Sequence, residues 1–130
     1  MSKTFPSIYP ILDSSFIPES GRSSFLDRLG RSLTDAGVTL LEYRNKGAAD
    51  AVLLSDAEIL RCAMPTGQVR LILDDRADLV DQVGFDGVHV DADDVSPVEA
   101  RRLAGPDRIV GTFGGSDVLV PGILDQPADY

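Results

Sequence analysis

The sequence predicts one α/β domain built on a parallel β-sheet. Short apolar segments of strand-like composition alternate with longer amphipathic segments along most of the chain. Only a few turn residues, chiefly glycine, proline and aspartate, separate them. Strict alternation of strands and helices with short loops is typical of parallel sheets whose strands are joined by helical crossovers.

The chain begins with a strand, a helix and a second strand. Residues 7–12 are apolar and stop at an aspartate, as a short strand would. Residues 19–36 predict a helix, and Gly37 is suited to the left-handed position just after it. Residues 38–43 form the next apolar strand. The apolar positions of the helix recur at helical spacing: Phe25, Leu26, Leu29, Leu33 and Ala36.

The same alternation continues through the middle of the chain. Residues 50–64 predict a helix that ends before a Pro-Thr-Gly turn. Residues 69–73 predict a third strand, residues 76–83 a short helix and residues 87–90 a fourth strand.

The clearest local signal marks the start of the fourth helix. Ser96 is a good N-cap, Pro97 suits the first helical position, and Glu99 completes a capping box. This helix is expected to run to residue 104, and residues 108–113 predict a fifth strand.

The pattern weakens at the end of the chain. Residues 117–126 are where a fifth helix is expected, but Pro121 and Gly122 would interrupt it. Residues 128–130 fall where a sixth strand would begin. A closed (β/α)₈ barrel needs about 200 residues or more. The sheet is therefore expected to be either open or part of a barrel.

Composition narrows the class of protein. The chain has 130 residues, 43% of them hydrophobic, and a net charge of −9. A free-standing nucleic-acid binder is not expected, because phosphate contacts need clustered lysine and arginine. No apolar run reaches the roughly 18 residues that cross a bilayer, and the N-terminus lacks a signal-peptide pattern. Cys62 is the only cysteine, which fits a reducing cytoplasm, and it is expected to be packed in a helix.

Charged side chains follow successive strands at the point where each strand ends. Arg44 and Lys46 are two residues apart after the second strand, so both are expected on one face. A guanidinium beside an ammonium suits phosphate or pyrophosphate. Asp74 and Asp75 follow the third strand, and an acidic cluster that includes Asp94 follows the fourth. Carboxylates with substrate phosphate suit Mg²⁺, so the pattern predicts a metal–pyrophosphate site.

Four sequence blocks resemble the thiamine-phosphate synthase family, together with its thiazole tautomerase-like relatives. The block from Gly37 to Lys46 resembles the family's G-x-T-x-x-Q-x-R-x-K strand. Residues 73–79 resemble its N-D block, residues 83–94 its A-D-G-x-H-x-G-x-x-D block, and residues 105–111 the strand before its Ser-x-His turn. The resemblance implies a (β/α)₈ TIM barrel, here an incomplete one of about five βα units in a single domain over residues 1–130.

The resemblance also implies a reaction and a set of site residues. The family joins hydroxymethylpyrimidine pyrophosphate to a thiazole phosphate, and its partners are these small phosphorylated molecules. Arg44 and Lys46 are implied as the catalytic pair that holds the pyrophosphate, while Asp75 and Asp94 are implied as Mg²⁺ ligands. Glu42, Asp74 and His89 occupy substrate-binding positions. A histidine at a strand end is more often packed and hydrogen-bonded than catalytic.

The chain departs from the family pattern at several positions. Glu42 replaces a glutamine, Asp74 an asparagine and Asp91 a glycine. Phe113 and Gly115 stand where serine and histidine are expected. Additional negative charge in a site for an anion costs binding energy, on the order of 4 kcal/mol for one charge at 4 Å and an effective dielectric near 20.

These departures leave alternatives open. Three alternatives are a Mg²⁺-dependent transferase of thiamine biosynthesis, a catalytically degenerate relative that is tautomerase-like or binds phosphate or metal, and a non-enzymatic half-barrel assembly module. The 130 residues alone are expected to be inactive and to self-associate as a dimer, because an incomplete barrel exposes strand edges and apolar surface.

Overall fold

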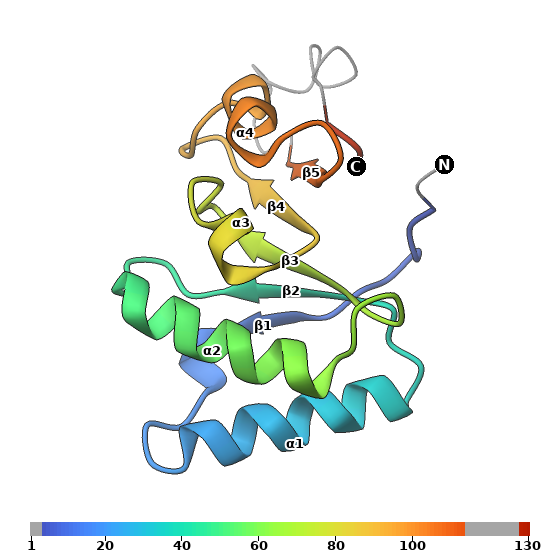
Figure 1. Ribbon diagram of the computed structural model, residues 1–130, viewed down its shortest axis with the longest axis vertical. Helices are drawn as coiled ribbons and strands as arrows, with labels where there is room; N and C mark the ends of the chain where they lie inside the picture. The colour runs from blue at the N-terminus through green and yellow to red at the C-terminus, as the bar shows by residue number, and fades with distance from the viewer. Residues whose placement is uncertain (1–3, 114–127) are drawn as a thin grey trace.

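Five parallel strands form one sheet, and their order along the sheet follows their order along the chain (Figure 1). The computed structural model describes residues 4–113 and 128–130. The strands are β1 (Ile11–Asp13), β2 (Leu40–Arg44), β3 (Arg70–Asp74), β4 (Gly87–Val90) and β5 (Ile109–Thr112). The helices are η1 (Ser14–Phe16), α1 (Arg22–Asp35), α2 (Asp50–Ala63), α3 (Val80–Val83) and α4 (Pro97–Ala104). This sequential parallel order confirms the predicted α/β fold and excludes a doubly wound strand order over the described residues.

The predicted elements are confirmed, and their boundaries differ by up to four residues, as at the starts of α1 and β2; two of the differences have a clear cause. β1 is shorter than the predicted strand over residues 7–12, since Pro10 just before it has no amide proton, although its carbonyl accepts from the Glu42 amide at 3.1 Å. α3 is shorter than the predicted helix over residues 76–83, because residues 76–79 form turns that follow a left-handed Asp75. The predicted segment 117–126 lies outside the described residues.

The residues predicted to end α1 and to begin α4 have those roles in the structure. Gly37 has a φ of 88° and follows α1, a conformation that glycine adopts without steric cost. The Ser96 side chain accepts from the Glu99 amide at 3.1 Å, which confirms the N-cap of α4. The prediction that Cys62 is packed in the core is wrong. Its side chain is exposed, whereas Leu60 and Ala63 of the same helix are buried.

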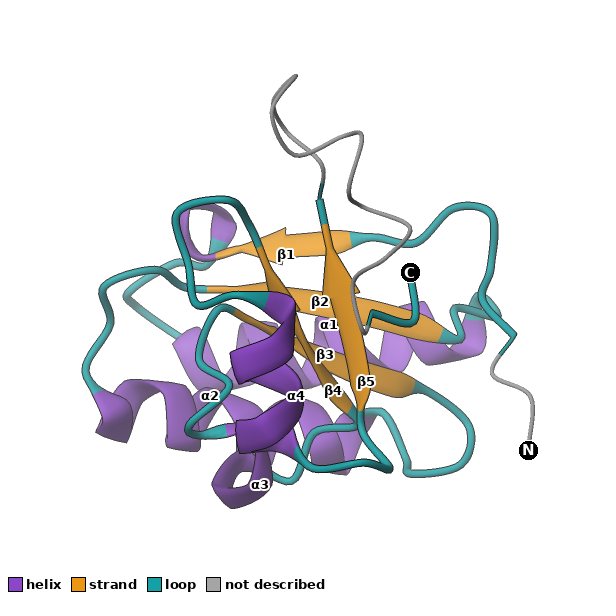
Figure 2. Ribbon diagram, turned by 90° about the horizontal axis from the view of Figure 1, so that it is seen from above, coloured by secondary structure: helices purple, strands orange, loops and turns teal. Residues whose placement is uncertain are grey.

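The two faces of the sheet have different partners. The helices α1–α4 cover one face, here called the outer face (Figure 2). The strands direct apolar side chains into the main core on that face, among them Leu41, Tyr43, Leu71, Leu73, Val88 and Val110. The opposite, inner face carries a smaller apolar cluster of Leu40, Ile72 and Ile109, against which Phe5, Tyr9 and Tyr130 pack. Strand registers place Glu42, Asp74 and His89 on this inner face as well.

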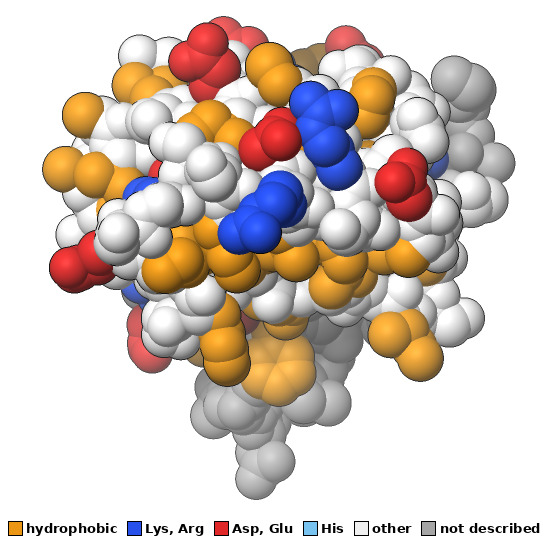
Figure 3. All heavy atoms as spheres, turned by 90° about the horizontal axis from the view of Figure 1, so that it is seen from below, with side chains coloured by type: hydrophobic (Ala, Val, Ile, Leu, Met, Phe, Trp, Pro, Cys, Tyr) orange, Lys and Arg blue, Asp and Glu red, His pale blue; other side chains and the backbone are white. Residues whose placement is uncertain are grey.

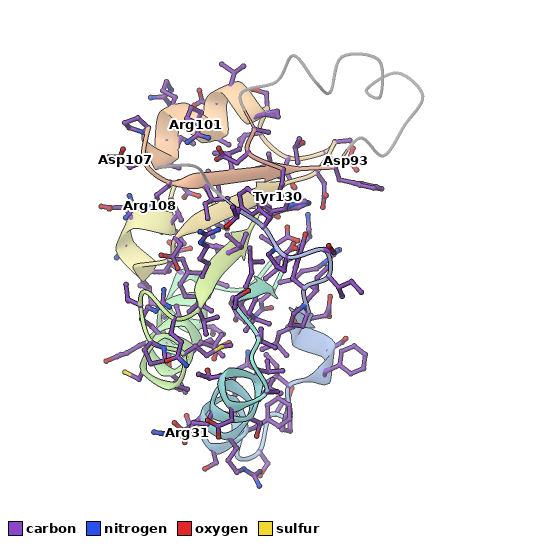
Figure 4. All side chains as sticks on the ribbon, turned by 90° about the vertical axis from the view of Figure 1, so that its right-hand side faces the viewer. Arg31, Asp93, Arg101, Asp107, Arg108 and Tyr130 are labelled. Atoms are coloured by element: carbon purple, nitrogen blue, oxygen red, sulfur yellow. The ribbon has the colours of Figure 1, made fainter. Side chains whose placement is uncertain are left out.

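The last described residues lie against β5. The Asp129 amide donates to the Val110 carbonyl at 2.6 Å, and the Thr112 amide donates to the Tyr130 carbonyl at 2.8 Å. The Tyr130 ring lies over Gly111, where a side chain larger than hydrogen would overlap it. These residues therefore take the place beside β5 that the sequence predicted for the start of a sixth strand (Figure 4).

Figure 3 shows one face of the molecule. Among its described residues, lysine and arginine side chains are interspersed with aspartate and glutamate, and several apolar side chains lie in a row across the middle of the view. No helix of the described residues is long and apolar enough to cross a membrane.

Candidate active site

Lys46 lies at the centre of an acidic cluster at the carboxyl ends of β2, β3 and β4. Its Nζ atom is 3.3 Å from Asp75 Oδ2 and 3.3 Å from Asp94 Oδ1. Asp74 Oδ1 lies at 3.6 Å and Asp91 Oδ2 at 3.8 Å. Burial by itself would lower the pKa of Lys46, but the hydrogen bond to Asp94 and the charge of Asp74 raise it above its ordinary value, so Lys46 stays charged.

Three of these carboxylates are spaced as metal ligands would be. One oxygen from each of Asp74, Asp75 and Asp94 lies within 4.8 Å of the others. Asp74 is 4% exposed, and among the described residues its Oδ1 atom has no hydrogen-bond partner, although the Lys46 ammonium faces it at 3.6 Å. A buried anionic oxygen without a hydrogen bond is costly unless a cation faces it. The donor set therefore fits a hard divalent cation such as Mg²⁺, which prefers carboxylate oxygens.

The backbone at Asp75 holds one of these ligands in place. Asp75 has a φ of 72°, a left-handed conformation that aspartate tolerates better than most residues. Its amide donates to the His89 carbonyl at 2.8 Å, and its own carbonyl accepts from the Ala77 amide at 3.1 Å. The sharp turn after β3 is thereby tied to β4 and leaves the carboxylate next to Lys46.

Glu42 and Asp74 form a buried carboxyl pair beside the cluster. Glu42 is 2% exposed and lies within hydrogen-bonding reach of Asp74. Burial, followed by the hydrogen bond and charge of Asp74, raises the pKa of Glu42 to about 8. Burial also raises the pKa of Asp74, although its hydrogen bond to Glu42 opposes the rise. Both effects place the shared proton on Glu42, so the pair carries less negative charge near neutral pH than its sequence suggests.

Two tyrosines border this carboxyl pair on the inner face. Tyr9 and Tyr130 meet edge to face with ring centroids 5.8 Å apart. Burial, followed by the charge of Glu42, raises the pKa of Tyr9. Burial, followed by Tyr9, also raises the pKa of Tyr130. Both phenols therefore stay protonated and form a neutral wall next to Glu42.

His89 is packed and hydrogen-bonded, as its position at a strand end indicates. Its Nε2 atom lies 3.1 Å from Asp91 Oδ1, and its ring is 5.9 Å from the Tyr130 ring. Its Nδ1 atom is buried and has no hydrogen-bond partner within the described part of the chain. His89 therefore borders the cluster through Asp91, which contacts both His89 and Lys46.

Arg44 is at the same end of the sheet but has a different partner. Its Nε atom is 3.4 Å from Asp13 Oδ2 at the end of β1, and both side chains are partly exposed. Exposed pairs of this kind contribute little to stability, typically under about 1 kcal/mol. Arg44 therefore lies at the same end of the sheet as Lys46, where its recorded ion pair is this weak one with Asp13.

Several neighbours of the site were not predicted from the sequence. Asp91 belongs to the acidic cluster predicted after the fourth strand, but its contacts with Lys46 and with His89 were not predicted. Tyr9 and Tyr130 come from the two ends of the described chain, so no local pattern connects them with Glu42. Phe113 is exposed, and Gly115 lies outside the described residues.

The chain is similar to known thiamine-phosphate synthases. Residues 8–130 match the family model described as thiamine monophosphate synthase. The thiamine-phosphate synthase of Koribacter versatilis is 45% identical over 108 residues, which cover 82% of this chain and 50% of that protein. The Rhodospirillum centenum enzyme is 38% identical over 124 residues, which cover 95% of this chain and 58% of that protein.

A solved structure agrees with these sequence matches. Thiamine phosphate pyrophosphorylase from Pyrococcus furiosus superimposes with a TM-score of 0.77 at 25% identity, covering 94% of this chain and 56% of that one. The chain spans about half the length of the curated relatives it matches. The match over residues 8–130 and the shared fold show that this chain belongs to the thiamine monophosphate synthase family.

Proposed function

We propose that this chain contributes the pyrophosphate and metal site of a thiamine-phosphate synthase. The substrates in this proposal are hydroxymethylpyrimidine pyrophosphate and a thiazole phosphate, and pyrophosphate is released. The observation that supports it best is the position of Lys46 among Asp74, Asp75 and Asp94 at the carboxyl ends of parallel strands. Ligands of α/β folds bind at this end of the sheet.

In this proposal the two cations hold the pyrophosphate. Lys46 exchanges some of its ion pairs with carboxylates for contacts with the anion. Arg44 is available because, among the described residues, its one ion pair is the partly exposed one with Asp13. Positive charge at the departing group stabilises the transition state more than the ground state, because negative charge accumulates there as the bond breaks. The thiazole nitrogen then captures the pyrimidine cation.

The acidic cluster is proposed to hold Mg²⁺ through Asp75 and Asp94, with Asp74 beside them on the substrate side. When bound, the ion would neutralise the carboxylates and the charge of the leaving pyrophosphate. The carboxylates themselves orient Lys46, whose Nζ is within 3.8 Å of each of them.

Glu42 and Asp74 favour a second candidate, a relative that binds phosphate or metal without synthesis. Acidic groups replace neutral ones at both positions, which opposes the binding of an anion. The proton that Glu42 retains reduces this opposition, because a neutral carboxyl group offers a donor and an acceptor, as the amide of glutamine does. We therefore favour the synthase, and the effect of replacing these two residues discriminates between the candidates.

Calorimetry of pyrophosphate binding with and without Mg²⁺ tests the proposed site. Binding should require Mg²⁺, and Asp75→Asn or Asp94→Asn should each weaken it about tenfold or more, the loss expected for a ligand to the metal. Asparagine tolerates the left-handed backbone at residue 75, so that change leaves the turn intact. Asp93→Asn is the matched control, because Asp93 is exposed and lies outside the cluster.

Two results would contradict the proposal. Pyrophosphate binding that survives both Asp75→Asn and Asp94→Asn would show that the cluster does not hold the metal. Replacing both Glu42 with Gln and Asp74 with Asn should tighten pyrophosphate binding, and weaker binding would show that the two acids serve a different ligand. The expected cytoplasmic location and dimeric state stay predictions.

A further inference from the structure

A buried chain of hydrogen bonds lies on the outer face of β2, behind the two cations. Asp56 of α2 is 2% exposed, and its carboxylate accepts from Arg22 Nε at 2.9 Å and from Arg22 Nη2 at 2.5 Å. The Tyr43 hydroxyl donates to the same carboxylate. Asn45 Nδ2 donates to the Tyr43 hydroxyl oxygen at 3.0 Å. These four residues, here called the Asp56 network, connect α1, α2, β2 and the loop after β2.

The charges and protonation of the Asp56 network fix which group donates and which accepts in each hydrogen bond. Arg22 pairs with Asp56 and compensates the charge of this buried carboxylate. Burial, followed by the hydrogen bond to Asp56, raises the pKa of Tyr43, so the phenol keeps its proton and donates it. The phenol oxygen is then left to accept from the Asn45 amide. The network therefore ends on a residue of the loop.

Asn45 stands between the two cations in the sequence. Tyr43 packs in the main core beneath the helices, and Asn45, two residues later, bonds to it on that side. Lys46, in contrast, reaches the acidic cluster. The turn that follows is closed by a bond of 3.4 Å from the Ala48 amide to the Asn45 carbonyl. Alternation along the strand thus separates the residues that anchor the loop from those that reach the ligand.

We infer that Asn45, Tyr43 and Asp56 are positioning residues that fix the end of β2 and the loop after it, which carry Arg44 and Lys46, for binding an anionic pyrophosphate group. The inference rests on the proposed function and adds residues that touch neither the anion nor the metal. Long cationic side chains lose considerable conformational freedom when they bind. When the Asp56 network fixes the backbone of these residues, less conformational entropy is lost on binding, because the two side chains start from fixed positions.

The test measures binding and local motion separately in the full chain. Asn45→Ala and Tyr43→Phe each break the last hydrogen bond of the network without adding volume to the core. Each should weaken Mg²⁺–pyrophosphate binding about fivefold, the factor that one ordinary hydrogen bond supplies. The double variant should bind pyrophosphate as tightly as Tyr43→Phe does, because Tyr43→Phe already removes the hydrogen bond that Asn45→Ala removes. Amide hydrogen exchange of residues 44–48 should become faster in all three.

Asp86→Asn is the matched control. Asp86 pairs with Arg61 at 2.8 Å and accepts from the Leu71 amide at 2.8 Å, so it also ties α2 to the sheet. It precedes β4, at the amino end of the strands, and lies outside the proposed site. Its replacement should lower the thermal unfolding temperature and leave pyrophosphate binding and exchange of residues 44–48 unchanged.

Two outcomes would overturn the inference. One is a loss of stability in Asn45→Ala and Tyr43→Phe with unchanged pyrophosphate affinity, and the other is an equal loss of affinity in Asp86→Asn. If the parent chain binds no pyrophosphate, the proposed function fails, and hydrogen exchange still decides the positioning role. Unchanged exchange of residues 44–48 in the variants would then refute that role by itself.

Discussion

Replacing Lys46 with methionine should tighten the binding of Mg²⁺ and weaken the binding of pyrophosphate. In the structure the Lys46 ammonium lies 3.3 Å from both Asp75 Oδ2 and Asp94 Oδ1, so it competes with a metal for the same oxygens. Methionine keeps the length of the side chain and removes its charge. Opposite effects on a cation and an anion would not follow from a general loss of structure.

The magnitude follows from the charges. A metal held by these oxygens would lie roughly 4 Å from the ammonium, and a charge of +2 facing +1 at about 4 Å costs about 2 kcal/mol even in the full dielectric of water. That energy corresponds to about thirtyfold in affinity. The lysine side chain is 34% exposed and is able to move aside, which reduces the effect. We therefore expect Mg²⁺ to bind about tenfold more tightly to Lys46→Met.

Isothermal titration calorimetry with Mg²⁺, in the absence of phosphate, measures this change. Arg31→Gln is the control, since it removes one positive charge from the exposed face of α1, far from the site (Figure 4). Its Mg²⁺ affinity should equal that of the parent chain. Unchanged or weaker Mg²⁺ binding by Lys46→Met would refute the reasoning, because Lys46 would then not be the cation that neutralises the cluster.

Three further predictions concern pH, association and activity. In the folded chain the pKa of Glu42 is raised to about 8, whereas in the unfolded chain it has its ordinary value of 4.5. Between these pH values the folded chain keeps a proton that the unfolded chain releases, so the free energy of unfolding should fall as the pH rises. Chemical denaturation in EDTA at several pH values measures this, and Glu42→Gln should flatten the dependence; an unchanged slope would show that Glu42 is ionised in the folded state. The chain should also self-associate, because Ile8 and Ile11 at the β1 edge are 89% and 55% exposed. Sedimentation should show weaker association for Ile11→Thr than for the parent chain. A monomeric parent chain would contradict this prediction. The 130-residue chain on its own should form no measurable thiamine phosphate from the two phosphorylated precursors with Mg²⁺, and robust turnover would refute that.

Much of the fold follows from the local sequence. Alternating apolar strands and amphipathic helices identify every described strand and the four α-helices, and the Ser96 cap marks the start of α4 within one residue. Parallel strands place their carboxyl ends at one edge of the sheet, so the sequence also predicts that Lys46, Asp75 and Asp94 lie at the same end. In the structure Lys46 contacts both aspartates. The short β1 and α3 were less predictable, because Pro10 and the left-handed Asp75 alter the backbone at single residues.

Other features depend on contacts between residues distant in the chain. Tyr9 and Tyr130 meet beside Glu42 only because the inner face gathers both ends of the described chain. In the sequence, nothing distinguishes Asp56 from the other polar residues of its amphipathic helix. In the structure it is buried and accepts hydrogen bonds from Arg22 and Tyr43. The charge that Glu42 carries is also a tertiary property, because burial and the nearby Asp74 decide whether its proton is kept. Residue types and strand ends thus determined which groups the site contains, whereas only the tertiary structure decided their partners, burial and charge, because those depend on distances through space.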